Sequence, residues 1–211
     1  MAITLYDYPR APSPRRARIL LAEKGIAHST VVVDLAAGEQ REAAFARINP
    51  RLTVPALTLD DGTTLTDNAA IIAWAEAAHP EPPMLGRTPL EKADVASWNH
   101  QLEFEAFGAI AEAMRNSAAA MKDRALPGPA DYPQIPELAV RGRARLSQFL
   151  DRFDRHLDGR EFVATDAFTV ADITAVVAID FARVVGVKPV ETHPAIRAWR
   201  ERLASRPSLS L

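Results

Sequence analysis

The stretch at residues 79–83 contains three prolines, and the apolar pattern of the chain changes across it. Before it, short apolar and β-branched runs alternate with helix-like segments. After it, apolar residues recur almost only at helical spacing. Proline ends both helices and central strands because it lacks an N–H group and has a fixed φ angle. The sequence therefore predicts an α/β domain at residues 1–79, a linker at 80–89 and an all-α domain at 90–211.

The first domain shows a mixed order of strands and helices. Two apolar runs flank Asp61-Gly62, a dipeptide that favours a tight hairpin turn. Val31, Val32 and Val33 form a β-branched run typical of a buried strand, which we expect to lie parallel to the first strand. The expected strands are residues 3–8, 28–34, 56–59 and 63–65, and the expected helices are residues 13–25, 38–48 and 67–78.

The first helix has signals at both ends. Ser13 precedes Pro14, which is the arrangement of an N-cap followed by a first-turn proline, and the apolar residues that follow reach as far as Gly25. We therefore expect Ser13 to cap this helix and Gly25 to end it.

The second domain shows several amphipathic helices. A proline-rich loop at residues 126–136 interrupts them, and loops of this length often border a binding site. Thr169 and Asp172 match a capping box, with Phe168 and Ile173 at the positions of a hydrophobic staple. The expected core positions are Val95, Trp98, Leu102, Ile110 and Met114 on one long helix, Leu146, Phe149, Leu150, Phe153 and Leu157 on another, and Ile196, Trp199 and Leu203 on the last.

The composition narrows the classes of protein and partner. With 211 residues, 48% of them hydrophobic, the chain can form two modest domains with buried cores. A net charge of −2 supplies no field that would attract nucleic acid or an anionic membrane. No apolar run approaches the roughly 20 residues of a membrane-spanning helix, and residues 1–9 lack the pattern of a signal peptide. We therefore expect a cytoplasmic protein that acts on small molecules.

The sequence contains no cysteine, and its five histidines are widely scattered. The first fact excludes disulfides, thiolate-bound metals and a cysteine nucleophile, and the second argues against a metal site. Any thiol chemistry must therefore use a thiol that another molecule brings.

Arg141, Arg143 and Arg145 could suggest contact with nucleic acid, but Glu137 and Asp151 nearby favour a solvated helix face.

Five local patterns occur along the chain: SPRRARILLAEKGI at 13–26, INPRLTVPAL at 48–57, LTDNAAIIAWAE at 65–76, HPEPPMLG at 79–86 and FTVADITA at 168–175. In this order and spacing they resemble the glutathione transferase superfamily over nearly the whole chain. The resemblance implies the fold class α/β plus all-α, a thioredoxin-like N-terminal domain with an all-helical C-terminal domain. The details are most similar to a microbial subgroup with an APNPRR or APSPRR motif near the N-terminus.

The resemblance implies glutathione as co-substrate and places its backbone contacts at Val54 and Pro55. A cis bond between them would turn the amide and carbonyl of Val54 outward, to pair with the cysteinyl residue of glutathione. The alternative for Pro55 is a trans proline at the start of a strand. The glycine carboxylate needs a basic or amide partner, for which Gln40, Arg41 and Thr53 are candidates.

The same resemblance assigns the γ-glutamyl end of glutathione to Asp67 and Asn68. Unpaired N–H groups and the dipole at a helix start favour a carboxylate, and Asp67 could bind the amino group. The family usually has Glu or Gln followed by Ser or Thr here, so this chain departs from the pattern at both positions. Asn68 can still donate a hydrogen bond to a carboxylate, and the alternative role of this pair is an ordinary helix N-cap.

A free thiol has a pKa of about 8.5, so the site has to stabilise the thiolate of glutathione. Ser13 is the candidate catalytic residue, together with the N–H groups at the start of the first helix. Arg15, Arg16 and Arg18 would add positive potential. The alternative is that Ser13 only caps its helix and that the arginines form a solvated face.

Other side chains are alternative candidates to Ser13 for stabilising the thiolate of glutathione. Tyr6 and Tyr8 are rival phenol donors, and strand alternation places them on the same side of the sheet. Some microbial members of the family use polar groups of the fourth helix instead, near Asn116 and Ser117. The electrophile is expected in a mostly apolar cleft lined by residues 9–12, 111–121 and 126–136.

These features predict a glutathione S-transferase that conjugates the glutathione thiolate to a hydrophobic electrophile, without a metal. The resemblance further implies a homodimer with a role in detoxification. Two alternatives remain open: a non-catalytic glutathione- or ligand-binding protein with the transferase fold, and a glutathione-dependent peroxidase, isomerase or dehalogenase. We expect no nucleic-acid or membrane partner.

Overall fold

The computed structural model describes residues 2–211, which divide into two compact units. The N-terminal unit comprises residues 2–82, 127–130 and 211, and the helical unit comprises residues 83–126 and 131–210. The division falls inside the proline-rich stretch. Within the described residues the N-terminal unit mixes strands with helices, whereas the helical unit holds helices only. The expected fold class, α/β plus all-α, is confirmed.

The sheet of the N-terminal unit consists, among the described residues, of β1 (Thr4–Asp7), β2 (Ser29–Val32), β3 (Ala56–Thr58) and β4 (Thr64–Leu65). Its strand order is β2-β1-β3-β4. β1 runs parallel to β2 and antiparallel to β3, with Leu5 opposite Leu57, and β3 and β4 form the hairpin predicted around Asp61-Gly62. The parallel pairing predicted for the first two strands is therefore confirmed.

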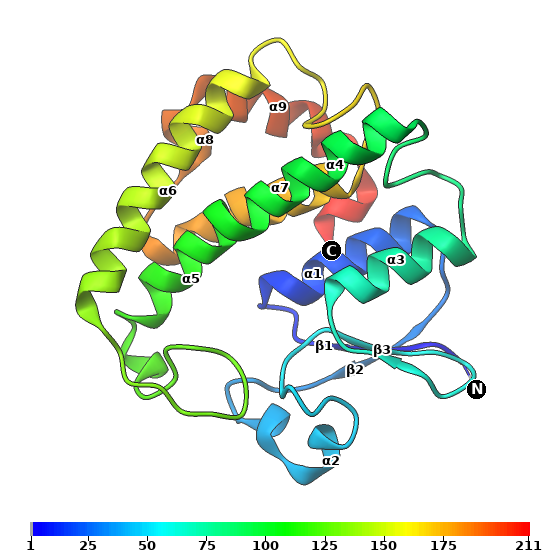
Figure 1. Ribbon diagram of the computed structural model, residues 1–211, viewed down its shortest axis with the longest axis vertical. Helices are drawn as coiled ribbons and strands as arrows, with labels where there is room; N and C mark the ends of the chain where they lie inside the picture. Colours follow the sequence, from blue (N-terminus) through cyan, green and yellow to red (C-terminus); the bar gives the residue numbers. More distant parts are fainter. Residues whose placement is uncertain (1) are drawn as a thin grey trace. The chain divides into compact units, whose positions relative to one another are not determined.

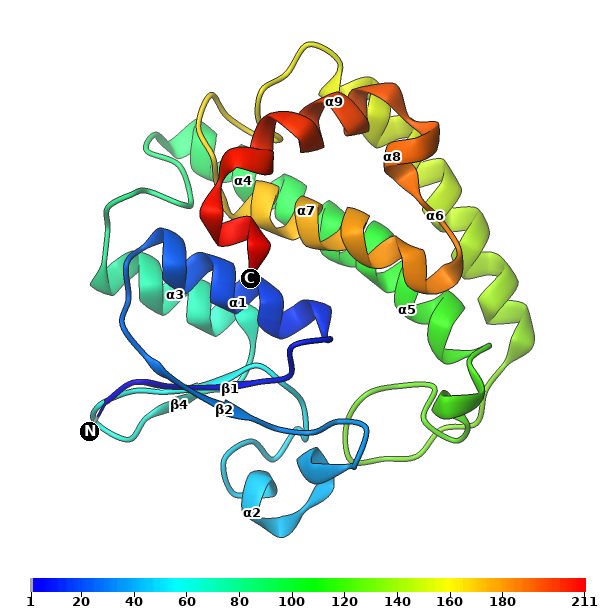
Figure 2. The same cartoon turned by 180° about the vertical axis from the view of Figure 1, so that it is seen from behind.

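Helices cover both faces of this sheet. α1 (Pro12–Glu23) and α3 (Asn68–Ala78) pack together on one face, and α2 (Ala43–Ala46) lies on the other (Figures 1 and 2). A short 3-10 helix, η1 (Glu39–Arg41), precedes α2, as expected for an irregular helix in this region. The starts of α1 and α3 therefore belong to one layer, and η1 and α2 belong to the other.

The prediction that the second strand is buried is wrong. All of β2 is exposed, with Val31 44% and Val32 56% accessible, and only Val33, just after the strand, is buried. β2 is an edge strand, because among residues 2–211 it pairs with β1 alone. A β-branched run is common to central and edge strands, so the pattern did not distinguish them.

The prediction that Ser13 caps the first helix is also wrong. α1 begins at Pro12 with Ala11 as its N-cap, so Ser13 lies inside the first turn. Pro12 and Pro14 are both tolerated there because the first N–H groups of a helix have no intrahelical partner. The predicted end of the helix is confirmed: Gly25 follows the C-cap with φ of +62°, a left-handed conformation suited to glycine.

A buried lysine joins the end of α1 to the end of α3. The ammonium of Lys24 is fully buried, pairs with the Glu76 carboxylate at 2.7 Å and donates to the carbonyls of His79 at 2.7 Å and Pro82 at 2.8 Å. All of these partners lie in the N-terminal unit. Lys24 thus fixes the proline-rich segment against both helices, which the sequence patterns did not predict.

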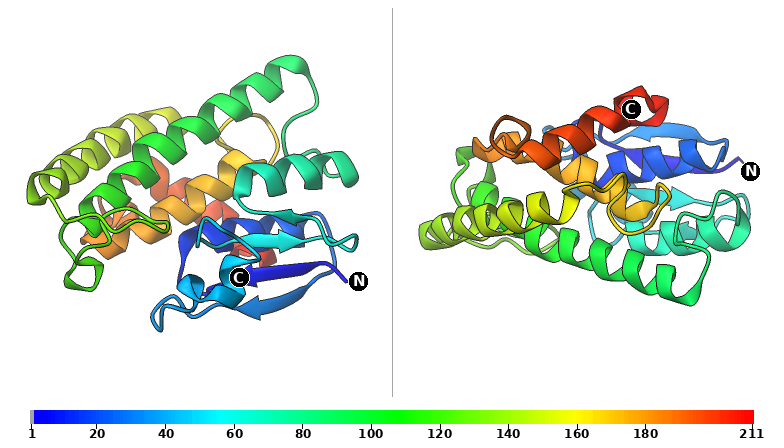
Figure 3. Two further views of the ribbon diagram at one scale, coloured as in Figure 1. Left: turned by 60° about the horizontal axis from the view of Figure 1, so that its bottom comes forward. Right: turned by 90° about the horizontal axis from the view of Figure 1, so that it is seen from above.

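The helical unit contains one long helix made of three parts. α4 (Pro89–Gln101) continues through a π-helical segment, η2 (Leu102–Phe107), into α5 (Gly108–Arg115), and Figure 3 shows the three as one continuous rod. The remaining helices of this unit are η3 (Ala119–Met121), α6 (Pro136–Leu157), α7 (Val170–Phe181), η4 (Ala182–Val185), α8 (Pro189–Thr192), α9 (Pro194–Arg202), η5 (Leu203–Ser205) and η6 (Pro207–Ser210).

The core of the helical unit surrounds α7, in which residues 170–179 are all buried. The predicted apolar stripe on α6 is buried along its whole length. The predicted capping box at the start of α7 is confirmed, because Asp172 accepts from the Thr169 N–H while the Thr169 side chain accepts from the amide of Asp172. Local sequence rules therefore predicted this unit well.

Two arginines of α6 form ion pairs with α5. Arg141 and Arg145 both form ion pairs with Glu112 of α5. Gly142 lies between them, and a Cβ there would approach the Ala109 carbonyl within 2.7 Å, so glycine allows the two helices to lie close together. Arg141 and Arg143 are exposed, as expected for a solvated face, whereas Arg145 is partly buried against α5.

No helix in residues 2–211 is both long enough and apolar enough to span a membrane.

Candidate functional site

The loop between α2 and β3 is organised by the side chain of Asn49. This side chain is buried, and its Nδ2 donates to the Thr53 carbonyl at 2.7 Å, to Thr53 Oγ1 at 3.3 Å and to the Thr66 carbonyl at 3.5 Å. Its Oδ1 accepts from the backbone N–H of Arg51 at 3.0 Å. One buried amide therefore fixes the loop to Thr66, the residue before Asp67.

Val54 follows this loop, and the peptide bond between Val54 and Pro55 is cis. The Val54 side chain packs with Val33 and Phe45 in a small apolar cluster. Within the described part of the chain, neither its N–H nor its carbonyl makes a hydrogen bond with another backbone group. Both groups are therefore available to an extended peptide ligand.

Asp67 is the N-cap of α3. Its Oδ1 accepts from the Ala70 N–H at 2.9 Å, and its Oδ2 accepts from the Arg51 guanidinium at 3.1 Å. The cap that the sequence offered as the alternative role of this residue is thus present, and a cation is bound to the second oxygen. Among residues 2–211, the N–H groups of Asn68 and Ala69 have no hydrogen-bond partner, as expected in the first turn of a helix.

The side chain of Asn68 points toward α1. It is buried, and its Nδ2 donates to the backbone carbonyl of Ser13 at 3.1 Å. This bond brings the starts of α1 and α3 together, so the candidate residues Ser13, Asp67 and Asn68 lie in one cluster. The amide donor that the sequence reasoning offered to a ligand carboxylate is therefore already engaged within the protein.

Ser13 does not cap α1, which leaves its hydroxyl uncommitted. In the part of the chain that the structure describes, Ser13 Oγ has no hydrogen-bond partner, although the backbone carbonyl of the same residue binds Asn68. A hydroxyl in the first turn of a helix lies in the positive potential of the helix dipole. Ser13 can therefore donate to an anion without breaking an existing bond.

The positive charge expected near Ser13 is partly neutralised. Arg18 forms a short ion pair with the buried carboxylate of Asp7 at 2.5 Å and also reaches the Pro9 carbonyl at 3.4 Å. Arg15 donates from Nε to the backbone oxygen of Leu211 at 3.1 Å. Arg18 therefore holds the loop between β1 and α1 in place, and its charge is balanced by Asp7.

The two tyrosines lie on the face of the sheet that α2 covers. Tyr6 packs edge to face on Phe45, with ring centroids 5.9 Å apart, and Tyr8 contacts the same apolar cluster. The prediction that strand alternation places both tyrosines on one side is confirmed. Ser13 belongs to α1, which lies on the opposite face (Figure 1).

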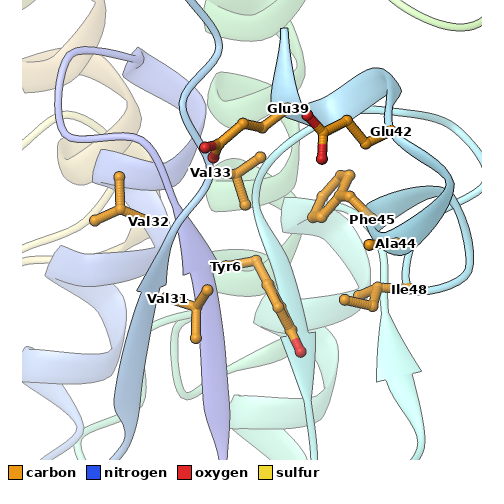
Figure 4. A pocket seen from close by; sticks show the side chains of 9 residues that line it. All are labelled: Tyr6, Val31, Val32, Val33, Glu39, Glu42, Ala44, Phe45 and Ile48. Carbon is orange, nitrogen blue, oxygen red and sulfur yellow. The ribbon is translucent and has the colours of Figure 1, made fainter. Parts of the chain in front are cut away.

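A pocket of about 180 Å³ opens between β2 and α2. Figure 4 shows Tyr6, Val31, Phe45 and Ile48 around its apolar part, with the carboxylates of Glu39 and Glu42 at one end. Ser13, Val54, Asp67 and Asn68 do not line it. The pocket nevertheless adjoins predicted residues, because Tyr6 lines it and Val54 packs against its lining residues Val33 and Phe45.

The candidates for the glycine carboxylate differ in their surroundings. Thr53 lies in the loop that Asn49 organises, directly before Val54. Gln40 is in η1, where it is buried and its Oε1 has no hydrogen-bond partner among the described residues, and Arg41 beside it is exposed. A buried amide oxygen without a partner is costly, so Gln40 is suited to a bound ligand or water.

The polar candidates at the end of α5 are engaged in the helical unit. The Asn116 side chain donates to the Glu112 carbonyl at 2.9 Å and accepts from the Ile135 N–H at 2.9 Å, and the Ser117 hydroxyl donates to the Ala113 carbonyl at 2.7 Å. These bonds secure the end of α5 and the segment before α6. No group of three or more metal-binding side chains occurs in the described residues.

Sequence reasoning missed two members of the site, Asn49 and Arg51. The sequence signal for Asn49 was its position directly before Pro50. The buried side-chain amide of Asn49 hydrogen-bonds to the backbone of Thr53 and Arg51 in the loop. Arg51 carried no local signal, because its partner Asp67 lies sixteen residues further along the chain.

Comparisons with known proteins identify the same family in the N-terminal and C-terminal parts of the chain. A family model described as the N-terminal domain of glutathione S-transferase matches residues 11–78, and one described as its C-terminal domain matches residues 114–207. Glutathione S-transferase 2 of Saccharomyces cerevisiae is 34% identical over 208 residues, which cover 97% of this chain and 87% of that protein. The maleylacetoacetate isomerase of Pseudomonas aeruginosa is 41% identical over 91 residues, 42% of this chain and 43% of that protein. Among solved structures, a glutathione S-transferase domain-containing protein of Marinobacter aquaeolei is similar with a TM-score of 0.87 at 33% identity, covering 98% of this chain and 99% of that one.

Proposed function

Because the chain belongs to the glutathione S-transferase family, we propose that it transfers the thiolate of glutathione to the electrophilic carbon of a hydrophobic substrate. The observation that carries the proposal is the bond from Asn68 to Ser13, which unites the starts of α1 and α3 beside Val54 and its unpaired backbone groups. In the reaction a sulfur–carbon bond forms, and the leaving group departs with its electron pair or the substrate takes up a proton.

The proposed contacts of glutathione follow its three parts. The backbone of Val54, next to Pro55, pairs with the cysteinyl residue, as an added strand pairs with a sheet edge. The start of α3 at Asp67 and Asn68 receives the γ-glutamyl end. The glycine carboxylate is bound by donors of Gln40, Arg41 and Thr53: the side-chain N–H groups of Gln40, the guanidinium of Arg41 and the hydroxyl of Thr53, which lies directly before Val54.

Ser13 is the proposed catalytic residue. Its uncommitted hydroxyl and its own N–H, which lies between two prolines that have none, stabilise the thiolate and shift the ionisation of the bound thiol toward neutral pH. Tyr6 and Tyr8 are less suited to this role, because both pack into the apolar cluster on the α2 face. Asn116 and Ser117 are already satisfied by backbone partners.

The remaining assignments extend this proposal. Residues 1–79 form the glutathione-binding domain, 80–89 the linker, and 90–211 the helical domain that carries the electrophile pocket. We propose that the chain belongs to the microbial subgroup with an APSPRR sequence, because residues 11–16 carry this motif. We assign the protein to the cytoplasm as a homodimer that acts in detoxification.

An isomerase is the second candidate. The relative from Pseudomonas aeruginosa that is named maleylacetoacetate isomerase supports it, since it is 41% identical over 91 residues. In such a reaction the thiolate would add to a double bond and leave again, so the same bound thiol would serve. Glutathione would then be recovered unchanged.

The proposal is tested by binding and turnover together. Calorimetry should show glutathione binding, ultraviolet absorbance should show the bound thiol ionised at neutral pH, and a generic aryl halide should be conjugated. Binding without ionisation would identify a non-catalytic carrier. Absence of both binding and conjugation would refute the proposed function, and turnover of an unsaturated dicarboxylate without consumption of glutathione would favour the isomerase.

A further inference from the structure

Arg51 and Asp67 form an ion pair at the start of α3 that is open to solvent. The guanidinium lies 3.1 Å from Oδ2 of Asp67, and the two side chains are 66% and 43% exposed. An ion pair with this exposure adds little to stability, since water and salt screen it. The pair is therefore available for interaction with a ligand.

The backbone of Arg51 is fixed although its side chain is exposed. Its N–H donates to the buried Asn49 side chain at 3.0 Å, and Leu52, the next residue, has φ of +55°, in the left-handed region. Such a conformation is unfavourable for a leucine and persists only where the surrounding structure imposes it. The loop therefore presents Arg51 to the start of α3 in a defined way.

The side-chain amide of Asn68 is poorly placed to serve a ligand at the start of α3, because it is buried and directed toward α1. The amide of Asn68 is turned inward and bound to the Ser13 carbonyl. Arg51 contributes a single bond to Asp67, and a guanidinium has five N–H donors in a planar fork suited to a carboxylate. Together with the unpaired N–H groups of Asn68 and Ala69, the Arg51 guanidinium can donate hydrogen bonds to an anion at the start of α3.

We propose that Arg51 and Asp67 together recognise the α-amino-acid end of the γ-glutamyl group, Arg51 binding the α-carboxylate and Asp67 the α-ammonium. When the zwitterionic end of the ligand lies against the ion pair, its α-carboxylate faces the Arg51 guanidinium and its α-ammonium faces the Asp67 carboxylate. The four charges then alternate in sign. Arg51 is thus a specificity residue for glutathione. This inference rests on the proposed function, because it needs glutathione to bind at this site.

The test compares glutathione with two analogues by titration calorimetry. One, 4-aminobutyryl-cysteinyl-glycine, lacks the α-carboxylate; the other, glutaryl-cysteinyl-glycine, lacks the α-amine. Arg51→Gln should weaken binding of glutathione by about tenfold, the value of a charge-assisted hydrogen bond, and should change binding of the decarboxylated analogue by less than about twofold. Asp67→Asn keeps a good N-cap. It should weaken binding of glutathione to a similar extent and should change binding of the analogue that lacks the α-amine by less than about twofold.

Arg47→Gln is the matched control, because Arg47 is an exposed arginine at the C-cap of α2. It should leave the affinity for all three ligands unchanged. The inference is overturned if Arg51→Gln leaves glutathione binding unchanged, strengthens it, or weakens glutathione and the decarboxylated analogue equally. Failure of the wild-type protein to bind glutathione refutes instead the proposed function, so the two failures are distinguishable.

Discussion

The side chain of Asn68 donates a hydrogen bond to the backbone carbonyl of Ser13 over 3.1 Å, joining residues 55 positions apart in the chain. Asn68 lies in the first turn of α3 and Ser13 in the first turn of α1. Two helix starts that favour anions are thereby held together in the N-terminal unit. The proposed positions of the thiolate and of the γ-glutamyl carboxylate depend on this bond.

Asn68→Ala should lower the free energy of unfolding by about 1 kcal/mol, because it removes a buried hydrogen bond. Asn68→Asp should lower it further, since the shape is kept but the donor becomes an acceptor facing the Ser13 carbonyl. Urea unfolding followed by circular dichroism measures both variants. If both keep the wild-type free energy, the bond does not tie the two helix starts together.

Ser13→Ala should leave the free energy of unfolding within about 0.5 kcal/mol of the wild type, because the hydroxyl caps nothing. Conjugation at neutral pH should nevertheless fall by about 100-fold, the effect of removing one donor to a developing anion. The pKa of the bound glutathione thiol, followed by its ultraviolet absorbance, should rise. Tyr6→Phe and Tyr8→Phe are the comparison variants, and loss of the thiolate in either of them instead would assign the role to a phenol.

Lys24→Met should lower the free energy of unfolding by about 3 kcal/mol, because it leaves the Glu76 carboxylate and two carbonyls without their cation. Lys92→Met, at an exposed position of α4, is the control and should have little effect. Thermal and urea unfolding give the comparison. Equal stability of the two variants would show that the buried ammonium contributes no more than a surface lysine.

Asp172→Asn should cost less stability at pH 7 than at pH 4. Burial raises the pKa of Asp172 from 3.8 to about 6, although hydrogen bonds from Val163 and Thr169 oppose the shift. Between about pH 4 and pH 6 the folded state therefore keeps a proton on Asp172 that the unfolded chain has lost. The stability that protonated Asp172 contributes to the folded state is lost as pH rises through this range. The asparagine does not titrate, so the wild type loses its advantage over that range.

Urea unfolding of both proteins from pH 4 to pH 7 measures this difference directly. The comparison with the variant is needed because burial lowers the pKa of His156, which makes the stability of the wild type fall as pH decreases. This second effect is common to both proteins and cancels. A stability difference that is constant with pH would contradict the raised pKa of Asp172.

Much of the fold was predictable because its signals are local. The left-handed turn at Gly25, the hairpin at Asp61-Gly62 and the capping box of Thr169 and Asp172 each depend on the preferences of residues within one turn of one another. The alternation that placed Tyr6 and Tyr8 on one face is equally local. These preferences act before any tertiary contact forms.

The errors arose where the answer depends on distant parts of the chain. The exposure of Val31 and Val32 follows from the place of β2 at the sheet edge, which is decided by which strands pair. The start of α1 shifted because Pro12 and Pro14 both fit its first turn, and the sequence could not choose between Ala11 and Ser13 as the cap.

The sequence by itself determined the order of the elements, the change to helices after the proline-rich stretch and the absence of a protein thiol. Only the tertiary structure decided that Asn68 binds Ser13, that Arg51 faces Asp67 and that the Ser13 hydroxyl stays uncommitted. The physical reason is the range of the forces: backbone preferences act within a few residues, whereas the partner of a polar side chain is chosen by the packing that brings remote segments into contact.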